Sequence, residues 1–113
     1  MNQHPPKYQK RRHEEWFKEW DKGIREAFYV VVAYHQLAQE QSKGHVSKPL
    51  VPLFTNDQII DLQAQRKRTL KLYALAQKGS HSENLIVSAD HAWLCLYHLY
   101  DKIPTTRRIK PSF

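Results

Sequence analysis

The chain has 113 residues and a mass of 13.5 kDa, which is the size of one small domain. Lysine and arginine number 18 against 11 aspartates and glutamates, so the net charge is +7 with histidine neutral. Three glycines and a hydrophobic fraction of 41% exclude collagen and low-complexity disorder. The single cysteine, Cys95, excludes an intramolecular disulfide and a cysteine-based zinc finger.

The N-terminal residues carry no apolar segment of the kind that begins a secretory signal. The longest apolar run, residues 27–34, is too short to cross a bilayer. A lone cysteine without an export signal is typical of a reducing compartment. The sequence therefore predicts a cytoplasmic protein that does not contact a membrane.

A first long helix is expected from about residue 13 to residue 41. Apolar residues recur there at the three-and-four spacing of one helical face, at Trp16, Trp20, Ile24, Ala27, Phe28, Val31, Tyr34 and Ala38. The β-branched run at residues 29–32 leaves a strand, and hence an α+β fold, as an alternative. Polar helix formers on both sides favour the helix, and Gly23 marks a point where it could bend.

Residues 44–54 are expected to form an extended connector, because Pro49 and Pro52 forbid regular helix. Their apolar neighbours predict that this connector packs across the helices. A capping box at residues 55–58, with Thr55 as the N-cap, then begins a second helix that ends at Gly79. The apolar stripe expected on that helix comprises Ile59, Leu62, Leu70, Tyr73 and Ala76.

A third helix is expected after a second capping box at residues 80–83, and Pro104 closes it. This helix is apolar around much of its circumference, so part of its apolar surface is expected to stay exposed and to favour a partner. The fold class predicted is all-α, a compact bundle of three main helices with a proline-containing connector. The domain organisation predicted is a basic arm (1–12), one helical domain (13–104) and a basic tail (105–113).

The basic residues cluster in three blocks that we expect to form one surface. Lys67, Lys71 and Lys78 share one side of the second helix at spacings of four and seven, with no acidic residue nearby in sequence. Such a row binds phosphate backbones through counterion release. The candidate nucleic-acid contacts are Arg11, Arg12, Arg66, Lys67, Arg68, Lys71, Lys78, Arg107 and Arg108.

A polar stripe on the third helix carries His91, Cys95 and His98 on one side. These are zinc ligand types, but a fourth ligand from elsewhere, such as His35, His45 or His81, would be needed. A cysteine–histidine nucleophile on one helix lacks suitable geometry, and no glycine-rich oxyanion loop accompanies it. The stripe is better interpreted as the polar side of an amphipathic helix, so we expect no metal, no cofactor and no catalysis.

The first helix carries more aromatic residues than a single buried stripe needs. Trp16, Phe17 and Tyr29 are therefore candidates for a protein interface. The function expected is a small non-catalytic accessory protein that binds nucleic acid with low sequence selectivity, within a larger protein assembly or a homo-oligomer. The alternative is a protein–protein interaction module, an inhibitor or assembly factor, with an acidic protein partner and no nucleic acid.

Overall fold

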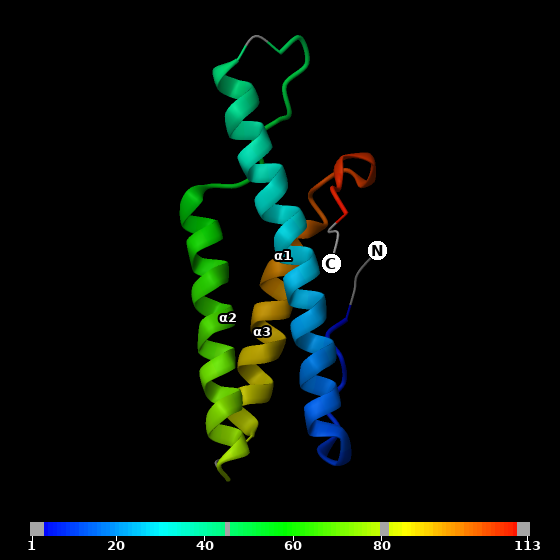
Figure 1. Cartoon of the computed structure of the whole chain (residues 1–113), viewed down its shortest axis with the longest axis vertical. Coiled ribbons are helices and arrows are strands. Elements are labelled where there is room, and N and C mark those ends of the chain that lie inside the picture. Colours follow the sequence, from blue (N-terminus) through cyan, green and yellow to red (C-terminus); the bar gives the residue numbers. More distant parts are fainter. Residues whose placement is uncertain (1–3, 45, 80–81, 111–113) are drawn as a thin grey trace.

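A computed structural model of the chain describes residues 4–44, 46–79 and 82–110. Those residues contain three long helices and no strand: α1 (His13–Lys43), α2 (Asn56–Gln77) and α3 (Glu83–Tyr100). Short 3-10 turns, η1 (Lys10–Arg12) and η2 (Thr105–Arg107), flank them (Figure 1). The all-α prediction is confirmed. No helix in these three ranges is both long and apolar enough to cross a membrane.

The helices run up, down and up, and α3 packs against both α1 and α2 (Figure 1). The backbones of α1 and α2 scarcely approach one another. The molecule measures 55 × 24 × 22 Å with a radius of gyration of 16.0 Å, against about 13 Å for a compact domain of this length. The bundle is elongated because the 31 residues of α1 extend about 46 Å at 1.5 Å per residue.

The valine-rich segment of α1 is helical, so the alternative strand through residues 29–32 is wrong. Val30 and Val31 are 5% and 0% exposed. A strand would direct two consecutive side chains to opposite faces, whereas the wide apolar side of α1 buries both. Burial against the rest of the bundle has overridden the β propensity of this segment.

Gly23 lies within an unbroken α1, where it makes room for α3. A Cβ atom at this position would lie 2.5 Å from Cη2 of Trp93. The hydroxyl of Tyr97 donates a hydrogen bond to the Gly23 carbonyl at 3.2 Å. Gly23, which the sequence marked as a possible bend, is therefore a position where α1 and α3 lie close together.

The connector between α1 and α2 folds back along the upper part of α1 (Figure 1). The hydroxyl of Tyr34 donates to the Val51 carbonyl at 2.6 Å, and the Leu50 amide donates to Oε1 of Gln41 at 2.7 Å. Phe54 is 6% exposed and its ring meets that of Tyr34 edge-on. The connector is a packed segment, as its composition predicts.

The starts of α2 and α3 differ in how they are capped. Thr55 accepts from the Gln58 amide, and the Gln58 side chain accepts from the Thr55 amide, which confirms the first capping box. For the second box, Ser80 and His81 lie outside the described residues. Ser82 precedes α3 and makes no side-chain capping hydrogen bond.

The core lies mainly between α1 and α3. Trp20 is fully buried, and its indole Nε1 donates to the Ala89 carbonyl at 3.0 Å. On α2 only Leu62 and Thr69 are buried, and the Thr69 hydroxyl meets that of Ser88 on α3 at 2.8 Å. The rest of the stripe expected on α2 is only half-buried: Ile59, Leu70, Tyr73 and Ala76. α2 thus buries far fewer of its side chains than α1 and α3 do.

Candidate nucleic-acid interface

The basic face of α2 comprises Lys67, Arg68, Lys71 and Lys78, all of them exposed. At 100° per residue the three lysines fall within about 40° of one another around the helix, with Arg68 beside them. None of the four makes an ion pair with a carboxylate in the described part of the chain. Four unneutralised cations therefore line one side of a surface helix.

Arg66 is directed elsewhere, toward α1. Its Nη2 lies 3.0 Å from Oδ1 of Asp21, and the second oxygen of the same carboxylate lies 3.2 Å from Nε of Arg25. Arg66 therefore joins α2 to α1. The sequence predicted it among the nucleic-acid contacts, but its side chain does not extend the basic face of α2. Its own Nε is buried with no acceptor among the described residues.

The remaining predicted cations do not join the α2 face into one track. Arg12 forms an ion pair with Glu15 one turn later, while Arg11 is exposed beside it in η1. Arg107 and Arg108 belong to the C-terminal segment, on the far side of α1 from α2 (Figure 1). Arg108 lies over the Tyr100 ring at 4.4 Å and donates to the Ile103 carbonyl.

Two of the three aromatic residues proposed for a protein interface lie in the core. Trp16 and Phe17 are 4% and 7% exposed. The Tyr73 ring of α2 stacks on Phe17 at 3.6 Å between centroids, and Trp16 donates through Nε1 to the Pro6 carbonyl. The N-terminal segment and α2 cover both side chains, which leaves Tyr29, at 41% exposure, on the surface.

The polar stripe of α3 brings one histidine near the cysteine. His91 Nε2 lies 3.7 Å from Cys95 Sγ, and His98 is exposed one turn further along the helix. In the ranges that the structure describes, no three His, Cys, Asp or Glu side chains gather as metal ligands would. His45 and His81, two of the possible fourth ligands, lie outside those ranges.

The exposed side of α3 also carries apolar side chains, as the sequence predicted. Val87 and Leu94 are 69% and 55% exposed. They are seven residues apart and therefore lie on one side of the helix. The two side chains form a small exposed apolar patch on α3.

Burial raises the pKa of two ionisable side chains on α3. Desolvation raises the pKa of Asp90 above its usual value. Burial, followed by the charges of Tyr100, Glu26 and Asp101, raises the pKa of Tyr97 to about 12. Neither group lies in a cluster of acid, base and nucleophile, and both shifts follow from the packing of α3.

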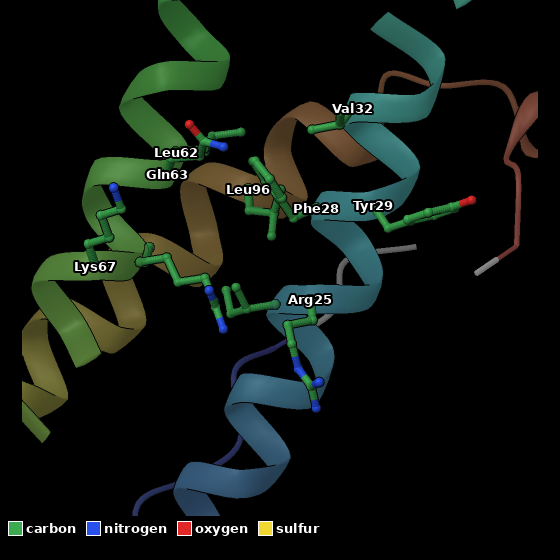
Figure 2. Close-up of a pocket in the computed structure, with 11 residues that line it drawn as sticks. Arg25, Phe28, Tyr29, Val32, Leu62, Gln63, Lys67 and Leu96 are labelled. Carbon is green, nitrogen blue, oxygen red and sulfur yellow. The ribbon is translucent and has the colours of Figure 1, made fainter. Parts of the chain in front are cut away.

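Sequence reasoning missed a groove between α1 and α2, here called the α1–α2 groove, whose floor is α3. It has a volume of about 450 Å³ and is lined mainly by Phe28 and Val32 of α1, Leu62 and Gln63 of α2, and Leu96 of α3. In Figure 2, Phe28 and Leu96 project between the two outer helices, whereas the Tyr29 ring points away from α2. The sequence signal was Val32, which lies four residues after Phe28 and directly beside the predicted apolar face.

Comparison with protein-family models, with curated proteins and with solved structures returned no match to this chain.

Proposed function

We propose that this chain is a non-catalytic accessory protein that binds the phosphate backbone of nucleic acid through the basic face of α2. The observation that carries the proposal is that Lys67, Arg68, Lys71 and Lys78 have no acidic partner in the described structure. Three arginines elsewhere in the described structure, Arg12, Arg25 and Arg66, are by contrast paired with carboxylates. Free cations release condensed counterions when they meet phosphates, whereas paired cations must first give up their partners.

The geometry of the face limits both affinity and selectivity. Four exposed cations on a single helix give at most about four phosphate contacts, which implies a salt slope near −3.6 on duplex DNA. The flanking side chains of α2 include apolar Ile60 and Leu75, both exposed, which cannot read base edges by hydrogen bonds. Binding is therefore directed at the backbone and weak, in the range of about 10⁻⁴ to 10⁻⁶ M at physiological salt.

The experiment measures the fluorescence anisotropy of labelled duplex DNA and single-stranded RNA with the full chain between 50 and 200 mM salt. We expect the affinity to fall about 100-fold over that range. The triple variant Lys67→Gln, Lys71→Gln and Lys78→Gln should remove most of the binding. A matched triple on α1, Lys18→Gln, Lys22→Gln and Lys43→Gln, makes the same change in net charge and should retain it.

Absence of binding at ~50 mM salt would exclude the proposal, because electrostatic docking is strongest at low salt. Equal losses in the two triple variants would show that net charge, and not the face of α2, drives binding. The alternative of an acidic protein partner is tested with polyglutamate in the same titration. If polyglutamate binds more tightly than either nucleic acid, the target of this face is an acidic protein and the proposal is wrong.

A further inference from the structure

The α1–α2 groove is a short, half-open chamber, and a side-chain contact joins the two helices beyond each of its ends. At one end the Arg66–Asp21–Arg25 cluster bridges the two helices. At the other end His35 of α1 meets Asn56, the first residue of α2, at 2.7 Å. The lining residues of α1 run from Ile24 to Val32, so the apolar length is about 12 Å at 1.5 Å per residue.

The two ends of the chamber differ in charge. Arg25 and Arg66 share the Asp21 carboxylate near one end, and Lys67 also lines the groove, so the cations outnumber the one carboxylate. The guanidinium of Arg66 has Asp21 as its acceptor within the described residues, and its Nε is buried without one. A buried donor that lacks an acceptor costs free energy unless a ligand or water supplies one. This end is therefore prepared to accept an anionic oxygen.

We infer that the α1–α2 groove binds a small amphipathic carboxylate of the medium-chain fatty-acid class. Its alkyl chain lies along Phe28, Val32, Leu62 and Leu96, and its carboxylate accepts hydrogen bonds from the guanidinium of Arg66. A volume of about 450 Å³ falls in the range of small-ligand sites, which are apolar with a few convergent polar groups. This inference does not rest on the nucleic-acid proposal, although Lys67 borders both the groove and the basic face of α2.

The length of the groove favours a small ligand over a docked helix. A stable protein interface buries about 800 Å² on each partner, and a helix that supplied this area would need a longer apolar channel. One turn beyond Val32 the side of α1 turns polar at exposed Gln36, and Gln39 bonds the side chain of Asn56. The short apolar length and the single charged end match a molecule with one apolar tail and one anionic head.

The experiment titrates the full chain by calorimetry with hexanoate, octanoate and decanoate, each below its micellar concentration. We expect one site per chain and a gain of about fourfold in affinity for each added methylene until the chamber is full. Decyltrimethylammonium, which keeps the chain but reverses the head-group charge, should bind at least tenfold more weakly than decanoate. Equal affinity for the two head groups, or no dependence on chain length, would overturn the inference.

Two variants locate the site. Gln63→Trp places a bulky side chain in the groove from an exposed position and should abolish decanoate binding, whereas Ala64→Trp, the next and also exposed residue of α2, should not. Arg66→Gln should weaken decanoate about tenfold and leave decyltrimethylammonium unchanged. Unaltered decanoate affinity in both Gln63→Trp and Arg66→Gln would show that the ligand lies elsewhere.

Further measurements test whether the variants fold and whether a second protein chain, rather than a small ligand, fills the groove. Circular dichroism should give helical spectra for all three variants, and amide chemical shifts of the wild-type chain should move with decanoate around Phe28, Val32 and Leu96. Light scattering of the ligand-free chain should report a monomer. A dimer that Gln63→Trp dissociates would mean that a second copy fills the groove, and the small-ligand inference would be wrong.

Discussion

The α1–α3 side of the bundle differs from the α2 side in how many side chains it buries. The contact between α1 and α3 contains the fully buried Trp20 and the close approach at Gly23. On α2, by contrast, only Leu62 and Thr69 are buried, while its outer face holds four free cations and its inner side borders the groove. Burial of apolar side chains supplies most of the folding free energy. It comes mainly from α1 and α3, whereas α2 keeps most of its side chains at least partly in solvent.

The largest effect that this comparison predicts is on the α1–α3 side. Trp20→Ala should cost about 3–5 kcal/mol of unfolding free energy, because it removes a fully buried indole and its hydrogen bond to Ala89. Leu75→Ala on α2, where the side chain is 50% exposed, should cost less than about 1 kcal/mol. Urea unfolding followed by circular dichroism measures both, and similar losses would contradict the unequal burial on the two sides.

The second prediction concerns a close approach of α1 and α3. Gly23→Ala should cost about 1–2 kcal/mol net, because the clash with the rigid Trp93 indole exceeds the helix propensity that alanine gains. Gly44→Ala is the matched control, since the nearest atom to its added Cβ is the Glu40 carbonyl oxygen at 3.8 Å. Thermal unfolding should show a lower Tm for the first variant alone. An unchanged Tm for Gly23→Ala would mean that α1 and α3 are not in close contact there.

The third prediction compares the starts of α2 and α3. Thr55→Ala should cost about 1 kcal/mol, because it removes the side chain that accepts from the Gln58 amide. Ser82→Ala should cost less than about 0.5 kcal/mol, because Ser82 makes no such hydrogen bond. Denaturant midpoints of the two variants test this directly, and a larger loss for Ser82→Ala would reverse the assignment of the caps.

The fourth prediction is a pH dependence carried by Tyr97. Its pKa is raised to about 12 in the folded chain, so between about pH 10 and pH 12 the unfolded tyrosine ionises while the folded one stays neutral. Stability is therefore lost as the pH rises through this window. At neutral pH Tyr97→Phe should cost about 1 kcal/mol for the lost hydrogen bond to Gly23.

That difference between wild type and Tyr97→Phe should shrink as the pH rises, because phenylalanine cannot ionise. Unfolding by urea at pH 8, pH 10 and about pH 11 measures it, with Tyr8→Phe as the control for general tyrosine loss. A gap that stays constant across these pH values would show that burial does not hold the Tyr97 proton.

The smallest predicted effect belongs to the basic face of α2. Lys67→Gln, Lys71→Gln and Lys78→Gln should each change the unfolding free energy by less than about 0.5 kcal/mol, because the side chains are exposed and unpaired. Arg66→Gln should cost more, since it removes the ion pair with Asp21. If the lysine variants were as costly as Arg66→Gln, the cations of this face would have structural partners and would not be free for phosphate.

The sequence predicts the elements of this fold well because their signals are local. The three-and-four spacing of apolar residues gives α1, and Thr55 with Gln58 gives the start of α2. The candidate site is predicted only in part. Arg66 meets Asp21 across 45 positions, and the groove exists because two helices are held apart, so no local pattern indicates either of them.

The aromatic residues of α1 also show that contacts between distant parts of the chain are hard to predict from local sequence. Trp16 and Phe17 exceed what one stripe needs, and that surplus predicted an interface. The cover comes from Pro6 and from Tyr73, a residue whose place on the inner side of α2 was itself expected. The sequence does not indicate how α1 and α2 are aligned along their lengths, and this alignment decides which aromatic side chains contact one another.

The position of α3 between the other two helices has a consequence for the order of folding. The bonds from Trp20 to Ala89 and from Tyr97 to Gly23 join residues 69 and 74 positions apart. Closing such long loops slows folding. During synthesis α1 leaves the ribosome before α3, so its indole and valine side chains lack their cover until α3 is released. A chain at that stage exposes apolar surface that favours aggregation.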